Sequence, residues 1–161
     1  MQKNYIIAGF PGVGKTASAD RKNVHDAESS AFKWKMDYKE VPAKRVKNEQ
    51  WPKNYIDHIM LEDNIHSGEV ILTSTHAEVL KGLLERTNVI AVIPTEDQEN
   101  EYLQRYLRRG SPAEFIRLMS EKWREFLQSV EYLAGIESDQ GYTLTIIRLQ
   151  PGQYLADILP R

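Results

Sequence analysis

The stretch Gly9-Phe10-Pro11-Gly12-Val13-Gly14-Lys15-Thr16 stands near the start of the chain and satisfies the pattern G-x-x-x-x-G-K-[ST]. The residues before it, Asn4-Tyr5-Ile6-Ile7-Ala8, are rich in β-branched and aromatic types, which predicts a buried strand. The residues after it, 16–21, can open a helix. Strand, glycine-rich loop and helix therefore follow one another in the order that this pattern requires to cradle phosphates.

The residue types of this loop suit a di- or triphosphate. Glycines at 9, 12 and 14 let backbone N–H groups turn inward, because a side chain there would collide with the ligand or forbid a positive φ. The loop ends at a helix N-terminus, which favours anions. Lys15 can reach the β- and γ-phosphates, and the Thr16 hydroxyl can bind the Mg²⁺ that bridges them. The alternative is a glycine-rich turn that binds nothing.

The whole chain has the composition of one soluble domain. Its 161 residues, 41% hydrophobic and 27% charged, are enough for one sizeable core. A net charge of −2 gives no global attraction to nucleic acid, so any basic site must be local. The absence of cysteine excludes disulfides and thiolate chemistry. No apolar run approaches the roughly 20 residues of a membrane span, and no signal-peptide pattern opens the chain, so we expect a cytoplasmic protein without a membrane partner.

Two carboxylates, Asp26 and Glu28, follow a short predicted strand at 24–26. Carboxylates at the carboxyl ends of strands in an open α/β sheet lie near the ligand crevice. Asp26 and Glu28 could therefore hold Mg²⁺-bound water or the acceptor group. A solvated turn with helix-capping residues is the alternative.

Residues 31–50 interleave aromatic and basic side chains, with Phe32, Trp34, Met36 and Tyr38 alternating with Lys33, Lys35 and Lys39. We interpret this segment as an acceptor-side insertion, because such a mixture could attract a phosphate-bearing or nucleobase acceptor. An exposed loop whose aromatic side chains pack inward is the alternative.

The run from Glu69 to His76 predicts a central parallel strand that turns polar where it reaches the crevice. An aspartate that helps to bind Mg²⁺ would normally stand at this end. Here the chain offers Ser74, Thr75 and His76, which shifts that duty toward the carboxylates at 26 and 28. His76 either meets a phosphate or orients a water, or it makes only a local hydrogen bond.

Three arginines precede a glycine break in Arg105-Tyr106-Leu107-Arg108-Arg109-Gly110-Ser111-Pro112. Arg105 and Arg108 are one turn apart and can share a helix face, so with Arg109 they can present planar donor forks to phosphate oxygens. Residues 105–112 are therefore predicted to form a lid that hinges at 110–112. A solvated helix C-terminus, where arginines suit the helix dipole, is the alternative.

The order of elements predicts the fold class. Predicted strands at 4–8, 24–26, 69–76, 88–94 and 142–149 alternate with helices, of which 112–134 is the longest and carries a core stripe from Phe115 to Leu133. Alternation of this kind predicts an α/β fold, a three-layer doubly wound parallel sheet of about five strands with right-handed crossovers. The turn and short helix at 151–159 close the chain.

The chain resembles the small P-loop kinases, the group of nucleoside monophosphate, shikimate, gluconate and polynucleotide kinases, and within it the short nucleotide-kinase-like proteins of bacteriophages and prophages. The resemblance rests on the loop at 9–16, on Asp26-x-Glu28-Ser29-Ser30-x-Phe32 and on Tyr106-x-x-Arg109-Gly110. It covers essentially the whole chain as a single domain, 1–161. Two departures stand out: the third strand lacks the Asp-Gly motif of adenylate kinase, and Glu28 replaces an expected aspartate.

This resemblance implies a P-loop NTPase fold with ATP and Mg²⁺ as ligands. The nucleotide site would comprise Gly9, Pro11, Gly12, Val13, Gly14, Lys15, Thr16 and Ala17. Thr16, Asp26 and Glu28 would hold the metal. Lys15, Asp26, Arg105, Arg108 and Arg109 would be the catalytic residues, and the turn at 151–159 would pass the adenine.

These features predict an ATP- and Mg²⁺-dependent phosphotransferase, a monomer or homodimer, whose acceptor is a (deoxy)nucleoside monophosphate. Two alternatives stay open. One is a kinase of a hydroxyl group, such as a polynucleotide 5′-end or a sugar, which the segment from Phe32 to Lys47 favours. The other is a nucleotide-binding regulatory module without transfer activity, against which stands the absence of a guanine-specifying N-K-x-D motif.

Overall fold

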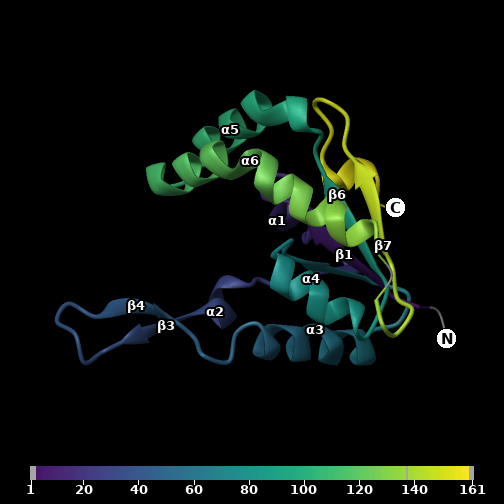
Figure 1. Cartoon of the computed structure of the whole chain (residues 1–161), viewed down its shortest axis with the longest axis horizontal. Coiled ribbons are helices and arrows are strands. Elements are labelled where there is room, and N and C mark those ends of the chain that lie inside the picture. The colour runs from purple at the N-terminus through teal and green to yellow at the C-terminus, as the bar shows by residue number, and fades with distance from the viewer. Residues whose placement is uncertain (1–2, 137, 160–161) are drawn as a thin grey trace.

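A parallel five-stranded sheet organises the chain. The computed structural model describes residues 3–136 and 138–159 (Figure 1). The strands are β1 (Tyr5–Gly9), β2 (Val24–Asp26), β5 (Val70–Thr73), β6 (Val89–Ile93) and β7 (Leu144–Arg148). Their order is β2-β5-β1-β6-β7, with Ile7 of β1 paired to Leu72 on one side and to Ile90 on the other. The strand that leads into the glycine-rich loop is therefore the central one.

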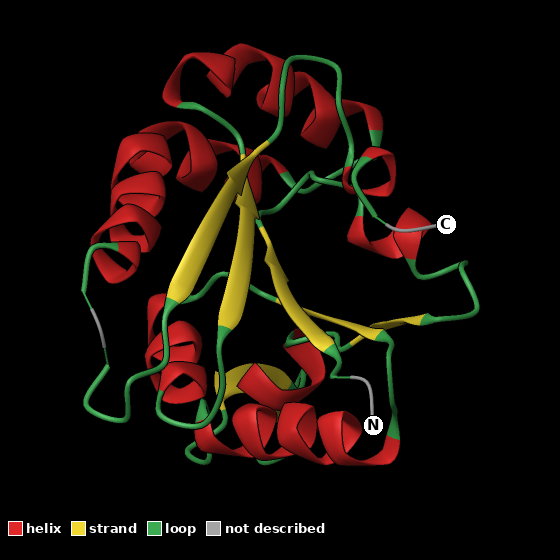
Figure 2. Cartoon of the chain, turned by 90° about the vertical axis from the view of Figure 1, so that its right-hand side faces the viewer, coloured by secondary structure: helices red, strands yellow, loops and turns green. Residues whose placement is uncertain are grey.

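Helices cover both faces of this sheet. The helices are α1 (Lys15–Ser18), α2 (Ser30–Lys33), α3 (Lys53–Ile65), α4 (Ala77–Leu84), α5 (Glu99–Arg108) and α6 (Ala113–Ala134), with 3₁₀ turns η1 (Glu96–Gln98) and η2 (Leu155–Asp157). Helices α3, α4 and α6 contact β5, β6 and β7 respectively, whereas α1 contacts β2 and η2. Right-handed crossovers place these two groups on opposite faces, as Figure 2 shows. The predicted three-layer doubly wound P-loop NTPase fold is confirmed.

The core lies where the apolar runs of the strands meet the helices. All four residues of β5 are buried, as are the last four of β1, which explains why these strands are continuous apolar runs rather than alternating ones. Gly82 sits at a close approach of α3 and α4, because a Cβ there would lie 2.2 Å from Cδ1 of Ile56. The glycine thus lets α3 pack directly on α4.

The longest helix, α6, spans 22 residues and buries Met119, Trp123, Leu127, Val130 and Leu133. The Trp123 indole N–H donates to the Glu96 carbonyl oxygen over 2.8 Å, which fixes α6 against the start of the preceding helix. Within the described residues, no helix combines the length and the apolar composition that crossing a membrane would require.

A β-hairpin interrupts the alternation of strands and helices, and the sequence pattern did not predict it. Strands β3 (Trp34–Asp37) and β4 (Lys44–Lys47) pair antiparallel, with Trp34 opposite Lys47, and form a separate two-stranded sheet. This hairpin, residues 34–47, is called the arm below. It extends far from the body of the molecule (Figure 1). The predicted insertion at 31–50 is therefore ordered into α2 and the arm.

Candidate active site

A large cleft opens at the carboxyl ends of the parallel strands. It lies next to β1, the point at which the order of the strands in the sheet reverses. Its volume is about 1030 Å³, which is at the upper end of the range for small-molecule sites. The glycine-rich loop, the end of β2, residues 74–78 and the facing sides of α5 and α6 line it. Open α/β sheets bind ligands at such a reversal point. The structure thus gathers segments that are more than 100 residues apart in the sequence around one volume.

The glycine-rich loop has the backbone that its glycines permit. Gly12 and Gly14 have φ values of 93° and 96°, a region that side chains rarely adopt. A Cβ at Gly12 would also lie 2.9 Å from Cε1 of Tyr106, and one at Gly14 would lie 3.2 Å from Cδ1 of Tyr154. Glycine is therefore needed at both positions for two reasons: the backbone has a positive φ, and aromatic side chains lie too close to the loop for a Cβ to fit.

Lys15 is held inside the loop. Its Nζ donates a hydrogen bond of 2.9 Å to the carbonyl oxygen of Gly9. Burial lowers the pKa of this ammonium, the carboxylates of Asp26 and Glu28 oppose that effect, and the positive charge of Arg109 adds to it. A poorly hydrated cation between two carboxylates and an arginine is well prepared to receive phosphate oxygens.

Asp26 and Glu28 both line the cleft, as predicted, but their surroundings differ. Burial raises the pKa of Asp26, although the charge of Lys15 opposes this. Burial would also raise the pKa of Glu28, but hydrogen bonds from the Ser30 N–H (3.2 Å) and hydroxyl (2.9 Å), together with Lys15, bring it below its ordinary value. Glu28 therefore also caps the turn into α2, which was the alternative interpretation of this motif.

The buried side chain of Tyr55 joins the ends of two strands. The Tyr55 hydroxyl donates to the carbonyl oxygen of Ala27 and accepts from the N–H of Ser74 over 3.3 Å. Desolvation of the buried hydroxyl raises its pKa above the ordinary value. The carboxyl ends of β2 and β5 are thereby held side by side. No motif of the sequence pointed to this role of Tyr55.

His76 lines the cleft and is neutral at pH 7. Burial, with Lys33 nearby, lowers its pKa to about 4. Lys33 Nζ lies 3.4 Å from its Nε2 and must be the donor, which leaves the Nδ1–H to donate to Ser74 Oγ over 2.7 Å. The local hydrogen bond is thus observed, and contact with a phosphate stays a prediction.

Arg105 lines the cleft with the other two arginines of the predicted lid, but protein atoms already bind its guanidinium. Its guanidinium is buried and donates 2.8 Å hydrogen bonds to the carbonyl oxygens of Gly12 and Gln153 and to the carboxylate of Glu101. The rings of Tyr102 and Tyr154 lie over it, with centroids 4.4 and 3.8 Å from Cζ. Its hydrogen bonds go to protein atoms and hold the glycine-rich loop in place, and its action on a phosphate stays a prediction.

Arg108 and Arg109 remain available to a ligand. Both are exposed and line the cleft, and Arg108 makes no ion pair with any residue in the described ranges. Arg109 is steadied by a 2.8 Å hydrogen bond from its Nε to Ser111 Oγ and by the ring of Tyr106, whose centroid lies 5.0 Å from its Cζ. The break at Gly110 has a φ of 76°, which suits the predicted hinge position between α5 and α6.

The opposite wall of the cleft is apolar and comes from α6. Phe115, Leu118, Met119 and Phe126 line it. The sequence pattern assigned this stripe to the core, and Met119 is indeed buried, but Phe115 and Phe126 are only partly buried and Leu118 is 43% exposed. Because the residues of this stripe are apolar throughout, the sequence could not distinguish those that pack in the core from those that line the cleft. This wall offers a surface on which a base could pack.

The arm begins at the edge of the same cleft, where Lys33 lines it. Phe32 packs inward on Tyr55 with ring centroids 5.4 Å apart, as the alternative interpretation expected. Trp34 is covered by Arg45, whose Cζ lies 4.2 Å from the ring centroid. Tyr38, further out, is 80% exposed. Only part of the aromatic set therefore serves the core.

Comparisons with known proteins support the fold. No family model matches the chain, and no curated protein matches it in sequence. Among solved structures, the tunicamycin resistance protein of Deinococcus radiodurans is similar to it with a TM-score of 0.57 and 17% identity, over 98% of this chain and 91% of that one. At this identity the similarity establishes a shared fold over the whole length of both chains.

Proposed function

We propose that this chain is an ATP- and Mg²⁺-dependent phosphotransferase whose acceptor is a small molecule, and that the acceptor is a (deoxy)nucleoside monophosphate. One observation carries the proposal: a single cleft of about 1030 Å³ is lined by Lys15, two carboxylates, two exposed arginines and an apolar wall. Such a volume has room for a donor nucleotide and a second small ligand.

The donor site is assigned to the glycine-rich loop. Its N–H groups and Lys15 bind the β- and γ-phosphates, and the Thr16 hydroxyl with the carboxylates of Asp26 and Glu28 form an all-oxygen ligand set of the kind that Mg²⁺ prefers. When bound, Mg²⁺ supplies positive charge between the two phosphates. Arg105 stacks on Tyr154 beside the loop and keeps Gly12 in place.

The reaction is in-line displacement at the γ-phosphorus. The bond from this phosphorus to the oxygen that bridges it to the β-phosphate breaks, a bond to the acceptor oxygen forms, and ADP leaves. Lys15, Arg108 and Arg109 stabilise the charge on the transferred group. A phosphate acceptor needs no strong base, whereas Asp26, whose pKa burial raises, could accept the proton of a hydroxyl acceptor.

The acceptor would lie between the arm side of the cleft and α6. Lys33 and the arginines offer positive charge for a phosphate, and Phe115 and Phe126 offer rings for a base. This combination favours a mononucleotide over an uncharged sugar.

A second candidate, a polynucleotide 5′-hydroxyl end, is favoured by the arm. Residues 33–47 contain six basic and two acidic side chains, and Tyr38 and Met36 are exposed beside them. Single strands bind to such mixtures of cations and aromatic rings. Binding through the arm would weaken steeply with salt, whereas binding of a mononucleotide would change little.

A transfer screen tests the proposal. The full chain is incubated with γ-labelled ATP, Mg²⁺ and each ribo- and deoxynucleoside monophosphate, a 5′-hydroxyl oligonucleotide, or tunicamycin, which the name of the structural neighbour places in the set. Label on one mononucleotide supports the proposal. Label on the oligonucleotide or on tunicamycin replaces the acceptor, and release of phosphate alone, equal with every acceptor, contradicts transfer and favours a regulatory module. The variant Lys15→Ala is the control for contaminating kinases.

A further inference from the structure

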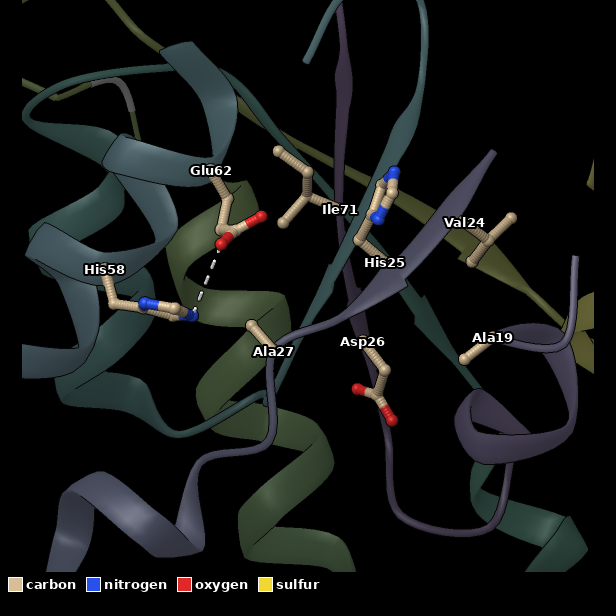
Figure 3. Close-up of a pocket in the computed structure, with 8 residues that line it drawn as sticks. All are labelled: Ala19, Val24, His25, Asp26, Ala27, His58, Glu62 and Ile71. Carbon is tan, nitrogen blue, oxygen red and sulfur yellow. Dashed lines mark ion pairs between the residues drawn. The ribbon is translucent and has the colours of Figure 1, made fainter. Parts of the chain in front are cut away.

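A cluster of three histidines and two glutamates lies on the face of β2 that points away from the active-site cleft. His25 comes from β2, His58 and Glu62 from α3, His66 follows α3, and Glu69 precedes β5. In Figure 3 the His25 ring and the Asp26 carboxylate project from opposite sides of the strand, and His58 and Glu62 point toward the His25 side. His25, His58 and Glu62 also line a second cavity of about 380 Å³. The cluster therefore lies across β2 from the proposed phosphotransferase site, and Asp26 lines both cavities.

Three of these side chains converge on one point. Glu69 Oε2 lies 3.1 Å from His25 Nε2 and 2.6 Å from His66 Nδ1, and all three ligand atoms lie within 4.8 Å of one another. Ligands bound tetrahedrally to Zn²⁺ at about 2.0–2.1 Å are separated from one another by about 3.3 Å. Both distances to Glu69 are shorter than this value, and the His25 and His66 rings are stacked with centroids 3.8 Å apart and planes 17° apart. One imidazole must therefore rotate as well as shift for both nitrogen lone pairs to point at one ion.

The other nitrogen of His66 has the partner that a metal-bound histidine normally has. Its Nε2 lies 3.0 Å from Glu62 Oε2. Such a carboxylate fixes the tautomer of the ring and leaves the Nδ1 lone pair free for a metal. Glu62 and Glu69 also bring two carboxylates to the cluster, and such groups attract a divalent cation.

The turn that carries two of the ligands is held in place by the backbone and by Asn4. Gly68 turns the chain with a φ of 71°. The Asn4 side chain donates to the His66 carbonyl oxygen over 2.9 Å and accepts from the Glu69 N–H over 3.0 Å. A preorganised turn therefore holds His66 and Glu69 beside His25, as a high-affinity metal site requires.

We propose that His25, His66 and Glu69 bind one divalent transition-metal ion of the Zn²⁺ class, with Glu62 as the residue that orients His66. Two imidazole nitrogens and one carboxylate select Zn²⁺, Co²⁺ or Ni²⁺ over Mg²⁺, which prefers oxygen ligands only. The ion joins the edge strand β2 to the end of α3 and the start of β5. It therefore acts as a clamp on the strand that carries Asp26, and it does not depend on the identity of the phosphate acceptor.

Metal titration of the full chain tests this site. Protein freed of metal with a chelator, without nucleotide, is titrated with Zn²⁺ by calorimetry and with Co²⁺ by visible spectroscopy, and its Tm is measured with and without Zn²⁺. We expect one equivalent to bind, a rise in Tm, and a Co²⁺ spectrum typical of four-coordinate nitrogen and oxygen ligation. The proposal would be overturned if Zn²⁺ did not bind stoichiometrically or if it left the Tm unchanged.

Variants locate the ion. His66→Asn and His25→Asn should weaken Zn²⁺ binding at least 100-fold, and Glu62→Gln should weaken it about 10–100-fold. His58→Asn is the matched control, because its ring lies beside Glu62 at 3.9 Å but outside the ligand set, and it should bind as the parent does. Zn²⁺ that still binds to His66→Asn with parental affinity would refute the site. The Tm of each variant in chelator establishes that it is folded, and Glu62→Gln decides the matter should a histidine variant fail to fold.

Discussion

Of the three arginines in the predicted lid, Arg105 alone is buried. Replacing it by methionine should therefore lower the free energy of unfolding. The change deletes two hydrogen bonds to carbonyl oxygens, those of Gly12 and Gln153, and one to the carboxylate of Glu101. Because the guanidinium is charged, all three hydrogen bonds are charge-assisted, and hydrogen bonds to charged groups contribute about 1.5–3 kcal/mol each. Methionine keeps much of the packing between the two tyrosine rings.

The free energy of unfolding should therefore fall by about 3–5 kcal/mol, the range found when one partner of a buried pair is removed. Glu101 moderates the loss, because its carboxylate still accepts from the Gly152 N–H over 2.9 Å. Such a loss is a large part of the roughly 5–15 kcal/mol that stabilises a typical domain. Arg108→Met, in the next turn of the same helix but exposed, should change stability by less than about 0.5 kcal/mol.

Urea denaturation followed by tryptophan fluorescence measures both variants. Trp123 lies in the aromatic cluster with Phe10 and Tyr102, so its emission reports on this part of the core. Equal stability of Arg105→Met and Arg108→Met would refute the positioning role of Arg105 and return it to the set of residues that face a phosphate.

Three further predictions concern the cleft. Arg109→Ala should lower the rate of phosphoryl transfer by at least 10-fold at unchanged stability, because Arg109 is exposed, lines the cleft with Lys15, and would lose its positive charge toward the transferred group; a parental rate in steady-state assays would contradict this. The pKa of His76 is lowered from 6.5 to about 4 in the folded protein, so the unfolded chain binds the proton more readily. The stabilisation that neutral His76 provides is therefore present above pH 6.5 and declines by up to roughly 3 kcal/mol as the pH falls toward 4. His76→Gln should remove this pH-dependent loss of stability. Denaturation of both proteins between pH 7.5 and 4 measures it, and parallel curves would exclude His76 as the cause. Asp26→Asn should abolish the fall of activity at low pH, because the ionised carboxylate is needed for metal binding and burial raises its pKa above the ordinary value. The residual activity of this variant is measured as a function of pH with excess Mg²⁺. A fall of activity at low pH that persisted unchanged would contradict the prediction.

Much of the fold could be predicted because its determinants are local. The loop at 9–16 and the apolar runs of β1, β5 and β6 are signals contained in a few consecutive residues. Their parallel order then follows from chain direction and the handedness of crossovers. The arm escaped prediction because the alternation of aromatic and basic side chains from Phe32 to Lys39 was interpreted as a binding segment rather than as a strand, and both strands of the arm are largely exposed.

The candidate site could be predicted only where the pattern itself carried the geometry. Lys15, Asp26 and Glu28 line the cleft as expected, since each is tied to the end of a strand. The arginines were treated as one set because residues three apart can share a helix face. In α5 that face divides: Arg105 belongs with the buried Tyr102 and Tyr106, which lie against the glycine-rich loop, while Arg108 turns to solvent.

Side chains that meet only after folding left no signal in the sequence. The Tyr55 hydroxyl bridges strand ends 28 and 19 residues away, and His25 meets Glu69 across 44 residues. Only the short spacing from His66 to Glu69 could have hinted at the histidine cluster, and such spacings are common in turns. Long-range contacts of this kind become visible only in the folded chain.

Calorimetric titration of the full chain with ATP in excess Mg²⁺, compared with Lys15→Ala, tests the central claim most directly. We expect one molecule of ATP to bind per chain, and the variant to remain folded by circular dichroism while its affinity falls by at least 100-fold, because the cation that faces the phosphates is lost. Equal affinity in the two folded proteins, or no binding of ATP to the parent, would contradict the assignment of the cleft as a nucleotide site.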